Sequence, residues 1–185
     1  ELVAATGTGT LAIAAPATLN VARISGEKAS NQSLTAAGAL TVAQHSADRT
    51  LAPVTALGTK WAMQGNSVDF NSHVELPSGA LKLTATAGDV ELGADAEVDV
   101  AGRSVQFFDV SKPSWGGTAE FVSETGNVVF DDGSKVDVSA AAGGDAGTLI
   151  VRAAKGMVSL ADGSVSGTAA VDADGQRGEG ACAVI

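Results

Sequence analysis

Residues 117–130 read GTAEFVSETGNVVF, and two other stretches align with them glycine on glycine: 79–92 (GALKLTATAGDVEL) and 147–160 (GTLIVRAAKGMVSL). In each stretch the second glycine follows the first by nine residues and is followed by apolar residues in alternation. Weaker copies begin at Gly9 and Gly38. Repeated short strands punctuated by glycine are typical of a solenoid, in which one repeat buries its apolar face only by stacking on the next. The repeat therefore predicts an all-β rod of stacked coils.

Apolar and polar residues alternate along most of the chain, and helical periodicity is almost absent, so short strands are expected. Consecutive strands are about 7 to 13 residues apart, which fits a coil of three strands and three turns. We expect successive coils to be built around Leu81, Val90 and Val98, then Ala119, Val128 and Val136, then Leu149, Val158 and Val165. The side chains expected to point into the solenoid are Leu83, Leu92, Val100, Phe130, Val138, Val151 and Leu160.

The chain is interpreted as one domain over residues 1–185, with a less regular N-terminal part over about 1–65. Residues 23–35 and 43–60 are polar, and we expect loops or irregular coils there. Residues 105–115 interrupt the repeat and are read as a partial extra coil or a protruding loop, because solenoids tolerate insertions at their turns. The chain opens on Glu1 rather than Met, which favours a piece of a longer polypeptide.

Composition excludes several partners. The formal net charge is −10, from 21 acidic and 11 basic residues, and the basic residues are scattered. Nucleic acid and anionic membrane surfaces are therefore not expected to bind, because both require clustered Lys and Arg. No apolar run approaches the length of a membrane span. Cys182 is the one cysteine, so the fold must hold without an intrachain disulfide.

The segments 98–110, 126–139 and 143–151 resemble the filamentous-haemagglutinin-like large exoproteins of Gram-negative bacteria, and the likeness is clearest over residues 79–170. The resemblance implies a right-handed parallel β-helix that is exported by two-partner secretion. It also implies a place at, or release from, the cell surface. The function that follows is a non-catalytic structural and interaction segment of a secreted adhesin or fibre, which acts as a stiff display rod. Its expected partners are other coils of the parent chain or further copies end to end, and a glycan or protein on a host or neighbouring cell.

Three aromatic residues, Phe107, Phe108 and Trp115, form the one local excess of aromatic side chains. If they protrude, they are the candidate contact with a sugar ring or a partner protein. The alternative, which we favour on frequency, is that they plug the side or end of the solenoid. Phe107 and Phe108 are neighbours on a strand, so at least one of them must face outward.

The sequence contains carboxylate pairs but no catalytic or metal motif, and no enzyme activity, cofactor or metal is predicted. The pairs Asp131/Asp132, Asp172/Asp174 and Glu97/Asp99 are read as turn-forming or outward-facing residues. His45 and His73 look isolated, and Val165 occupies the nucleophile position of the elbow-like segment 163–167. The alternative function is a carbohydrate-binding or polysaccharide-cleaving β-helix, which a groove with convergent Asp, Lys and Arg along one sheet would favour.

The two ends of the solenoid are expected to be uncapped. Neither end shows a capping helix or a polar cap repeat. The first and last coils are therefore expected to expose apolar side chains around Leu11 and Val165, together with unpaired backbone groups.

Overall fold

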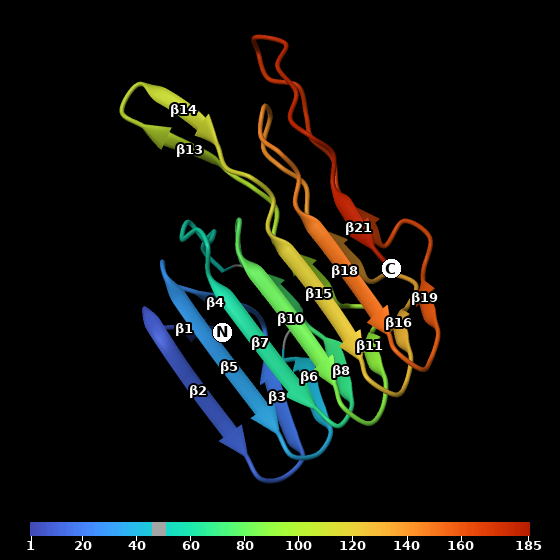
Figure 1. The fold of residues 1–185 in the computed structure, drawn as a ribbon. Helices are drawn as coiled ribbons and strands as arrows, with labels where there is room; N and C mark the ends of the chain where they lie inside the picture. Colours follow the sequence, from blue (N-terminus) through green and yellow to red (C-terminus); the bar gives the residue numbers. More distant parts are fainter. Residues whose placement is uncertain (46–50) are drawn as a thin grey trace.

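The structure, a computed structural model, describes residues 1–45 and 51–185. All regular elements in the described residues are strands, arranged in three parallel sheets and one hairpin (Figure 1). Sheet A contains, in spatial order, β1 (Leu2–Ala4), β4 (Ile24–Gly26), β9 (His73–Glu75), β12 (Glu97–Asp99), β17 (Lys135–Asp137) and β20 (Val165–Ser166). Sheet B contains β2 (Gly7–Ile13), β5 (Ser30–Ala36), β7 (Lys60–Gly65), β10 (Ala80–Ala85), β15 (Thr118–Ser123), β18 (Thr148–Ala153) and β21 (Cys182–Val184). Sheet C contains β3 (Ala17–Val21), β6 (Leu40–Gln44), β8 (Val68–Asn71), β11 (Val90–Leu92), β16 (Val128–Phe130) and β19 (Val158–Leu160).

The chain winds repeatedly through these sheets in the order B, C, A, and each strand pairs in parallel with its equivalent in neighbouring coils. In Figure 1 the sheet B strands run downward at the front, the chain returns behind them, and the coils advance from blue to red, which is a right-handed path. The predicted all-β, right-handed parallel β-helix with about three strands per coil is confirmed.

The pairing register confirms the three coils expected from the glycine spacing. Leu81 pairs with Ala119 and Ala119 with Leu149, while Val98 pairs with Val136 and Val136 with Val165. Of the seven side chains predicted to point inward, six are buried and Leu160, in the last sheet C strand, packs against the core while half-buried. Phe121 and Phe130 meet edge to face inside the rod, with ring centroids 5.0 Å apart.

The glycines recur because the backbones of successive coils touch at these positions. A Cβ on Gly117 would overlap the carbonyl oxygen of Gly79, and one on Gly147 would overlap the carbonyl oxygen of Gly117. The weaker copies were placed wrongly. Leu11 aligns across successive coils with Leu34, Met63 and Leu83. Gly9 therefore aligns with Leu81, two residues after Gly79, and not with Gly79 itself. Gly38 precedes a sheet C strand and corresponds to Gly88.

The expected irregularity at 23–35 is wrong, because β4 and β5 occupy most of it. Strand β5 carries polar Asn31, Ser33 and Thr35 on its outer side, whereas Leu34 and Ala36 point into the core. Polar residues on the solvent face of a strand were therefore mistaken for a loop.

Of the second expected irregular segment, 43–60, residues 46–50 lie outside the described residues, and residues 51–59 form no strand. In the described residues between β6 and β7 no strand joins sheet A, and β4 pairs directly with β9 through Ile24 and Val74. The buried Trp61 ring lies near this pair, and its Nε1 donates to the carbonyl of Ser25 at 3.0 Å.

Candidate functional site

Three insertions leave the β-helix at one corner, where sheet A strands turn into sheet B strands (Figure 1). They are the hairpin of β13 (Ser104–Phe107) and β14 (Val110–Pro113), and the loops 139–147 and 167–181. Their bases stack, since the N–H of Gly116 donates to the carbonyl of Asp145 (2.8 Å) and that of Ala146 to Glu179 (2.9 Å). Of the two readings of 105–115, the protruding loop is correct.

The three aromatic residues singled out in the sequence lie on this hairpin and at its base. Phe107 and Trp115 are 58% and 66% exposed, and Phe108 is fully exposed. The favoured interpretation, that they plug the solenoid, is therefore wrong. The physical reason is that the hairpin is antiparallel and pairs only with itself among the described residues, which carries its side chains away from the stack.

The hairpin has one apolar and one polar face. The cross-strand pairs Phe107–Val110 and Val105–Lys112 share one face, whereas Ser104–Pro113 and Gln106–Ser111 share the other. Its tip also carries strain, because Phe108 has φ of 53°, a conformation that Gly or Asn adopts more easily than a bulky residue.

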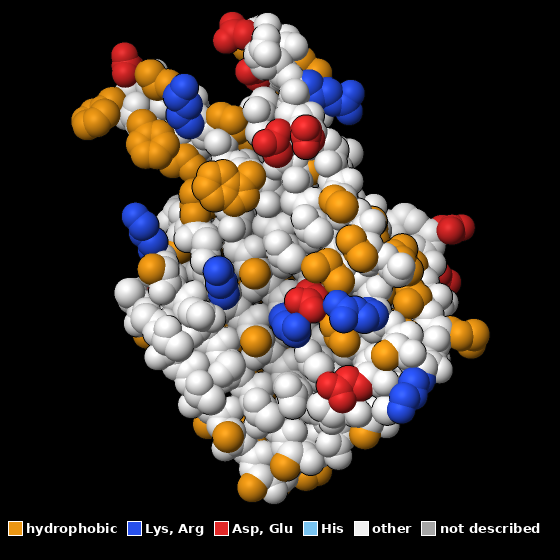
Figure 2. Space-filling view, viewed as in Figure 1, with side chains coloured by type: hydrophobic (Ala, Val, Ile, Leu, Met, Phe, Trp, Pro, Cys, Tyr) orange, Lys and Arg blue, Asp and Glu red, His pale blue; other side chains and the backbone are white. Residues whose placement is uncertain are grey.

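Two hollows flank the hairpin. The first, of about 380 Å³, is almost entirely apolar and is lined mainly by Leu57, Val105, Phe107, Pro113 and Trp115. Figure 2 shows apolar side chains gathered on the hairpin and at its base. The second, of about 350 Å³, lies between residues 53–57 and 103–106 and includes Glu75. The two share Leu57 and Val105, so they meet at one line along β13.

A second cluster, on the outer face of sheet A, is ionic and centres on Arg23. Its Nη1 donates to Glu75 Oε2 (2.8 Å) and to the carbonyl of Ala52 (2.9 Å), and its Nη2 to Glu1 Oε1 (2.6 Å). Burial would raise the pKa of Glu1, but the hydrogen bonds from Arg23 and Ser25 and the charge of Arg23 outweigh it, so this pKa is lowered. Arg23 thereby ties the first coil to β9 and to the described segment before β7 that begins at residue 51.

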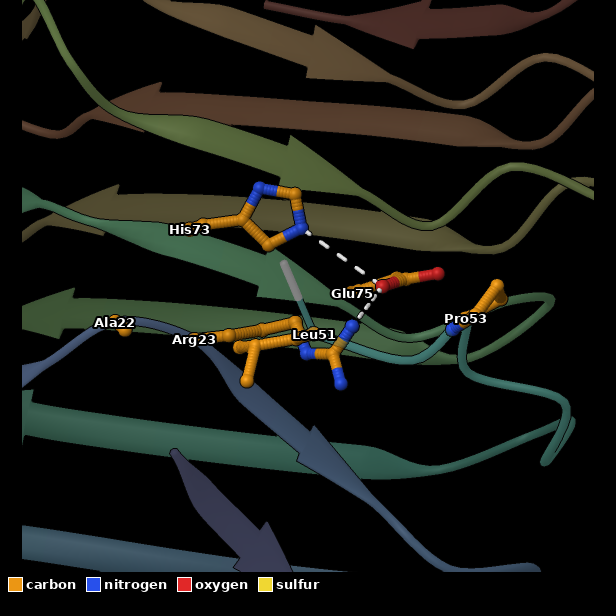
Figure 3. A pocket seen from close by; sticks show the side chains of 6 residues that line it. All are labelled: Ala22, Arg23, Leu51, Pro53, His73 and Glu75. Carbon is orange, nitrogen blue, oxygen red and sulfur yellow. Dashed lines mark hydrogen bonds and ion pairs between the residues drawn. The ribbon is translucent and has the colours of Figure 1, made fainter. Parts of the chain in front are cut away.

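His73 belongs to the same face, and the expectation that it is isolated is wrong. Its Nδ1 lies 3.2 Å from Glu97 Oε2, and its Nε2 lies 4.0 Å from Glu75 Oε2. Figure 3 shows His73 and Arg23 directed at Glu75 in a hollow of about 250 Å³. The length of the coil could have predicted the contact between His73 and Glu97, because Glu97 occupies the position of His73 one coil later. His45, in contrast, is exposed.

The other carboxylates stand where turn chemistry places them. Asp172 Oδ1 accepts from the N–H groups of Asp174 and Gln176 (3.0 and 2.7 Å), and the carbonyl of Asp131 accepts from Ser134 in the turn before β17. Glu97 and Asp99 face outward on β12. Val165 lies on β20, where it forms part of a sheet rather than an elbow.

The described residues hold no group of three or more His, Cys, Asp or Glu side chains placed for a metal ion. They also include no helix with the length and apolarity of a membrane span. The Cys182 thiol is free and exposed on β21.

Two candidate surfaces thus lie on the described part of the chain: the apolar hairpin with its hollows, and the ionic face of sheet A. No family model, curated protein or solved structure matches the chain.

Proposed function

We propose that this chain is a non-catalytic structural and interaction segment of a secreted bacterial surface adhesin or fibre of the filamentous-haemagglutinin-like kind. The observation that carries the proposal is the exposed aromatic hairpin 104–113 on an otherwise regular stack of coils. Exposed apolar groups of this size are expensive in water, and they are retained where a partner covers them. The stacked coils make the segment stiff, and the hairpin provides the surface that contacts a partner.

The rod would act by displaying the hairpin at a distance from the cell. Coils rise by about 4.8 Å each, so the seven strands of sheet B span about 30 Å. Leu11 and Val165 are exposed in the first and last coils, as expected for edges that further coils or further copies would cover. We place the rod at a Gram-negative cell surface, because the resemblance over residues 79–170 implies that location.

Labelling of intact cells tests the proposal. An antibody raised against residues 101–117 is expected to stain unpermeabilised cells of the source organism or to detect the protein in its culture medium. The labelling should disappear when the gene is deleted. Staining that requires permeabilisation, with no protein in the medium, would contradict surface display.

The ionic face of sheet A favours a second candidate, a carbohydrate-binding or polysaccharide-cleaving β-helix. Glu75, Glu97 and Asp99 lie there with Arg23, Arg103 and Lys135, the kind of convergence that this alternative requires. Most of these groups bind one another: Arg103 Nη2, for example, lies 2.6 Å from Asp99 Oδ2. Paired carboxylates are poor general acids and bases, so we favour a structural role for them.

We therefore expect no turnover when the protein is incubated with a panel of neutral and anionic polysaccharides, followed by assays for reducing ends and unsaturated products. A Glu75→Gln variant serves as the control for any signal. Turnover that is abolished by this substitution would replace the display function with the enzymatic one.

A further inference from the structure

The outer edge of β13 is an unpaired strand edge that opens into a recess. The N–H of Ser114 donates to the carbonyl of Arg103 (2.8 Å), which makes 103/114 a hydrogen-bonded pair of the hairpin ladder. Hydrogen-bonded and non-bonded pairs alternate along an antiparallel ladder. The backbone N–H and C=O groups of Ser104 and Gln106 therefore point away from β14, and both residues line the hollow of about 350 Å³.

The two edges of the hairpin differ. On β14 the outward positions are Ser111 and Pro113, the cross-strand partners of Gln106 and Ser104. Pro113 has no N–H, so this edge offers one fewer donor, a common way to blunt an edge strand. The edge of β13 keeps both of its donors, which makes it the side on which a further strand can pair.

Space for the side chains of an added strand lies next to this edge. A strand added beside β13 would continue the hairpin's apolar face, where Val105 and Phe107 lie. Its side chains on that face would enter the apolar hollow of about 380 Å³ beside Leu57 and Trp115. An unpaired backbone edge next to an apolar hollow is the arrangement by which proteins bind an extended peptide as an extra strand: the main chain supplies hydrogen bonds and the hollow selects the side chain.

We propose that the recess between residues 53–57 and β13 binds an extended peptide segment of a partner protein as a third strand of the hairpin, with large apolar side chains seated beside Leu57 and Trp115. This proposal rests on the display function, because it identifies what the displayed hairpin contacts. The strained, exposed Phe108 fits the same role, since it closes a tight two-residue turn and keeps the two strands in register beside the recess.

Two other occupants fit the recess less well. A neutral glycan needs polar groups around its ring, whereas the hollow at Trp115 is almost wholly apolar. A strand from a second copy of this β-helix would carry its coil behind it, and the recess is walled on one side by residues 53–57 and on the other by the hairpin. A free extended segment meets neither obstacle.

The test uses an array of capped heptapeptides of sequence Thr-X-Thr-X-Thr-X-Thr, with X as Val, Ile, Leu, Phe or Trp, and clustered (non-alternating) peptides of the same composition. We expect alternating peptides to bind in fluorescence titrations, with the clustered versions at least tenfold weaker. Gln106→Pro removes an edge N–H outside the hairpin ladder and should weaken binding at least tenfold, the equivalent of about 1.4 kcal/mol. The matched control Ser111→Pro makes the same change on the opposite edge and should bind like the wild type.

Backbone amide resonances of the non-proline residues in 104–112 check that both proline variants keep the hairpin. Trp115→Ala, which leaves the ladder intact, provides a second variant with an expected loss of at least tenfold. Equal binding by Gln106→Pro and wild type, or no binding by any alternating peptide, would overturn the proposal. So would a peptide-free dimer that Gln106→Pro dissociates, which would make a second copy the occupant. Binding of cellohexaose that depends on Trp115 and not on Gln106 would make it a glycan. Surface labelling of cells does not depend on any of these results, so the display function stands or falls separately.

Discussion

Gly147→Ala is expected to destabilise the protein by about 3 kcal/mol or more, because the new methyl group has no space between two coils. A Cβ on Gly147 would overlap the carbonyl oxygen of Gly117, which is itself backbone and accepts a hydrogen bond from the N–H of Thr148 (2.9 Å). Neither partner can move without separating β15 from β18. The free energy of unfolding, measured by denaturant titration, gives the size of the effect.

Gly180→Ala is the matched control, since nothing lies within 4 Å of a Cβ at that glycine. We expect this substitution to change the free energy of unfolding by no more than about 0.5 kcal/mol. Equal midpoints for Gly147→Ala and wild type would mean that the coils are not stacked backbone to backbone as described.

Arg23→Met is the second substitution with a large expected effect, about 3–5 kcal/mol of destabilisation. The side chains of Arg23 and Glu75 are only 9% and 14% exposed, so removing the guanidinium leaves the Glu75 carboxylate without its closest cation. It also leaves the carbonyl of Ala52 without its donor. Thermal and denaturant unfolding of the variant at neutral pH measure the loss.

Lys82→Met removes a cation from an exposed ion pair with Glu120 and serves as the comparison. The Lys82 side chain is 48% exposed, and surface pairs of this kind contribute about 0–1 kcal/mol. If Lys82→Met and Arg23→Met cost the same, Arg23 would not be the tie between the first coils that the contacts indicate. The double variant Arg23→Met/Glu75→Leu should recover part of the loss, because it removes the orphaned charge as well.

The repeat could be predicted because its cause is local. Each coil needs a small residue where two backbones touch and alternating apolar residues where a strand faces the core, and both requirements are written into 79–92, 117–130 and 147–160. The same prediction failed at Gly9, where a Cβ would meet only the Gln32 side chain, and at Gly38, which lies at the position of the second glycine of the repeat rather than the first. It also failed over 23–35, where the polar outer side of a strand looks like a loop.

The aromatic hairpin could be located but not oriented from the sequence. The interruption of the repeat at 105–115 and the adjacent Phe107 and Phe108 marked a break in the coil pattern. Whether their rings face the core depends on whether the segment pairs with neighbouring coils or with itself, and two strands of four residues with a two-residue turn permit either. In the structure the two strands pair with each other, and the rings of Phe107 and Phe108 are therefore exposed.

By itself, the amino-acid sequence determined the strand composition, the coil period over 79–170 and the inward-facing positions, because these depend on spacing along the chain. Only the tertiary structure decided which residues from different coils meet. Arg23 and Glu75 meet because β4 pairs directly with β9, and Glu1 reaches Arg23 because β1 pairs with β4 on its other side. The recess beside β13 likewise exists because residues 53–57 and the hairpin leave the stack near each other. In a solenoid, lateral neighbours are separated by a whole coil of sequence, and insertions alter that separation, so contacts across coils cannot be read from a fixed spacing.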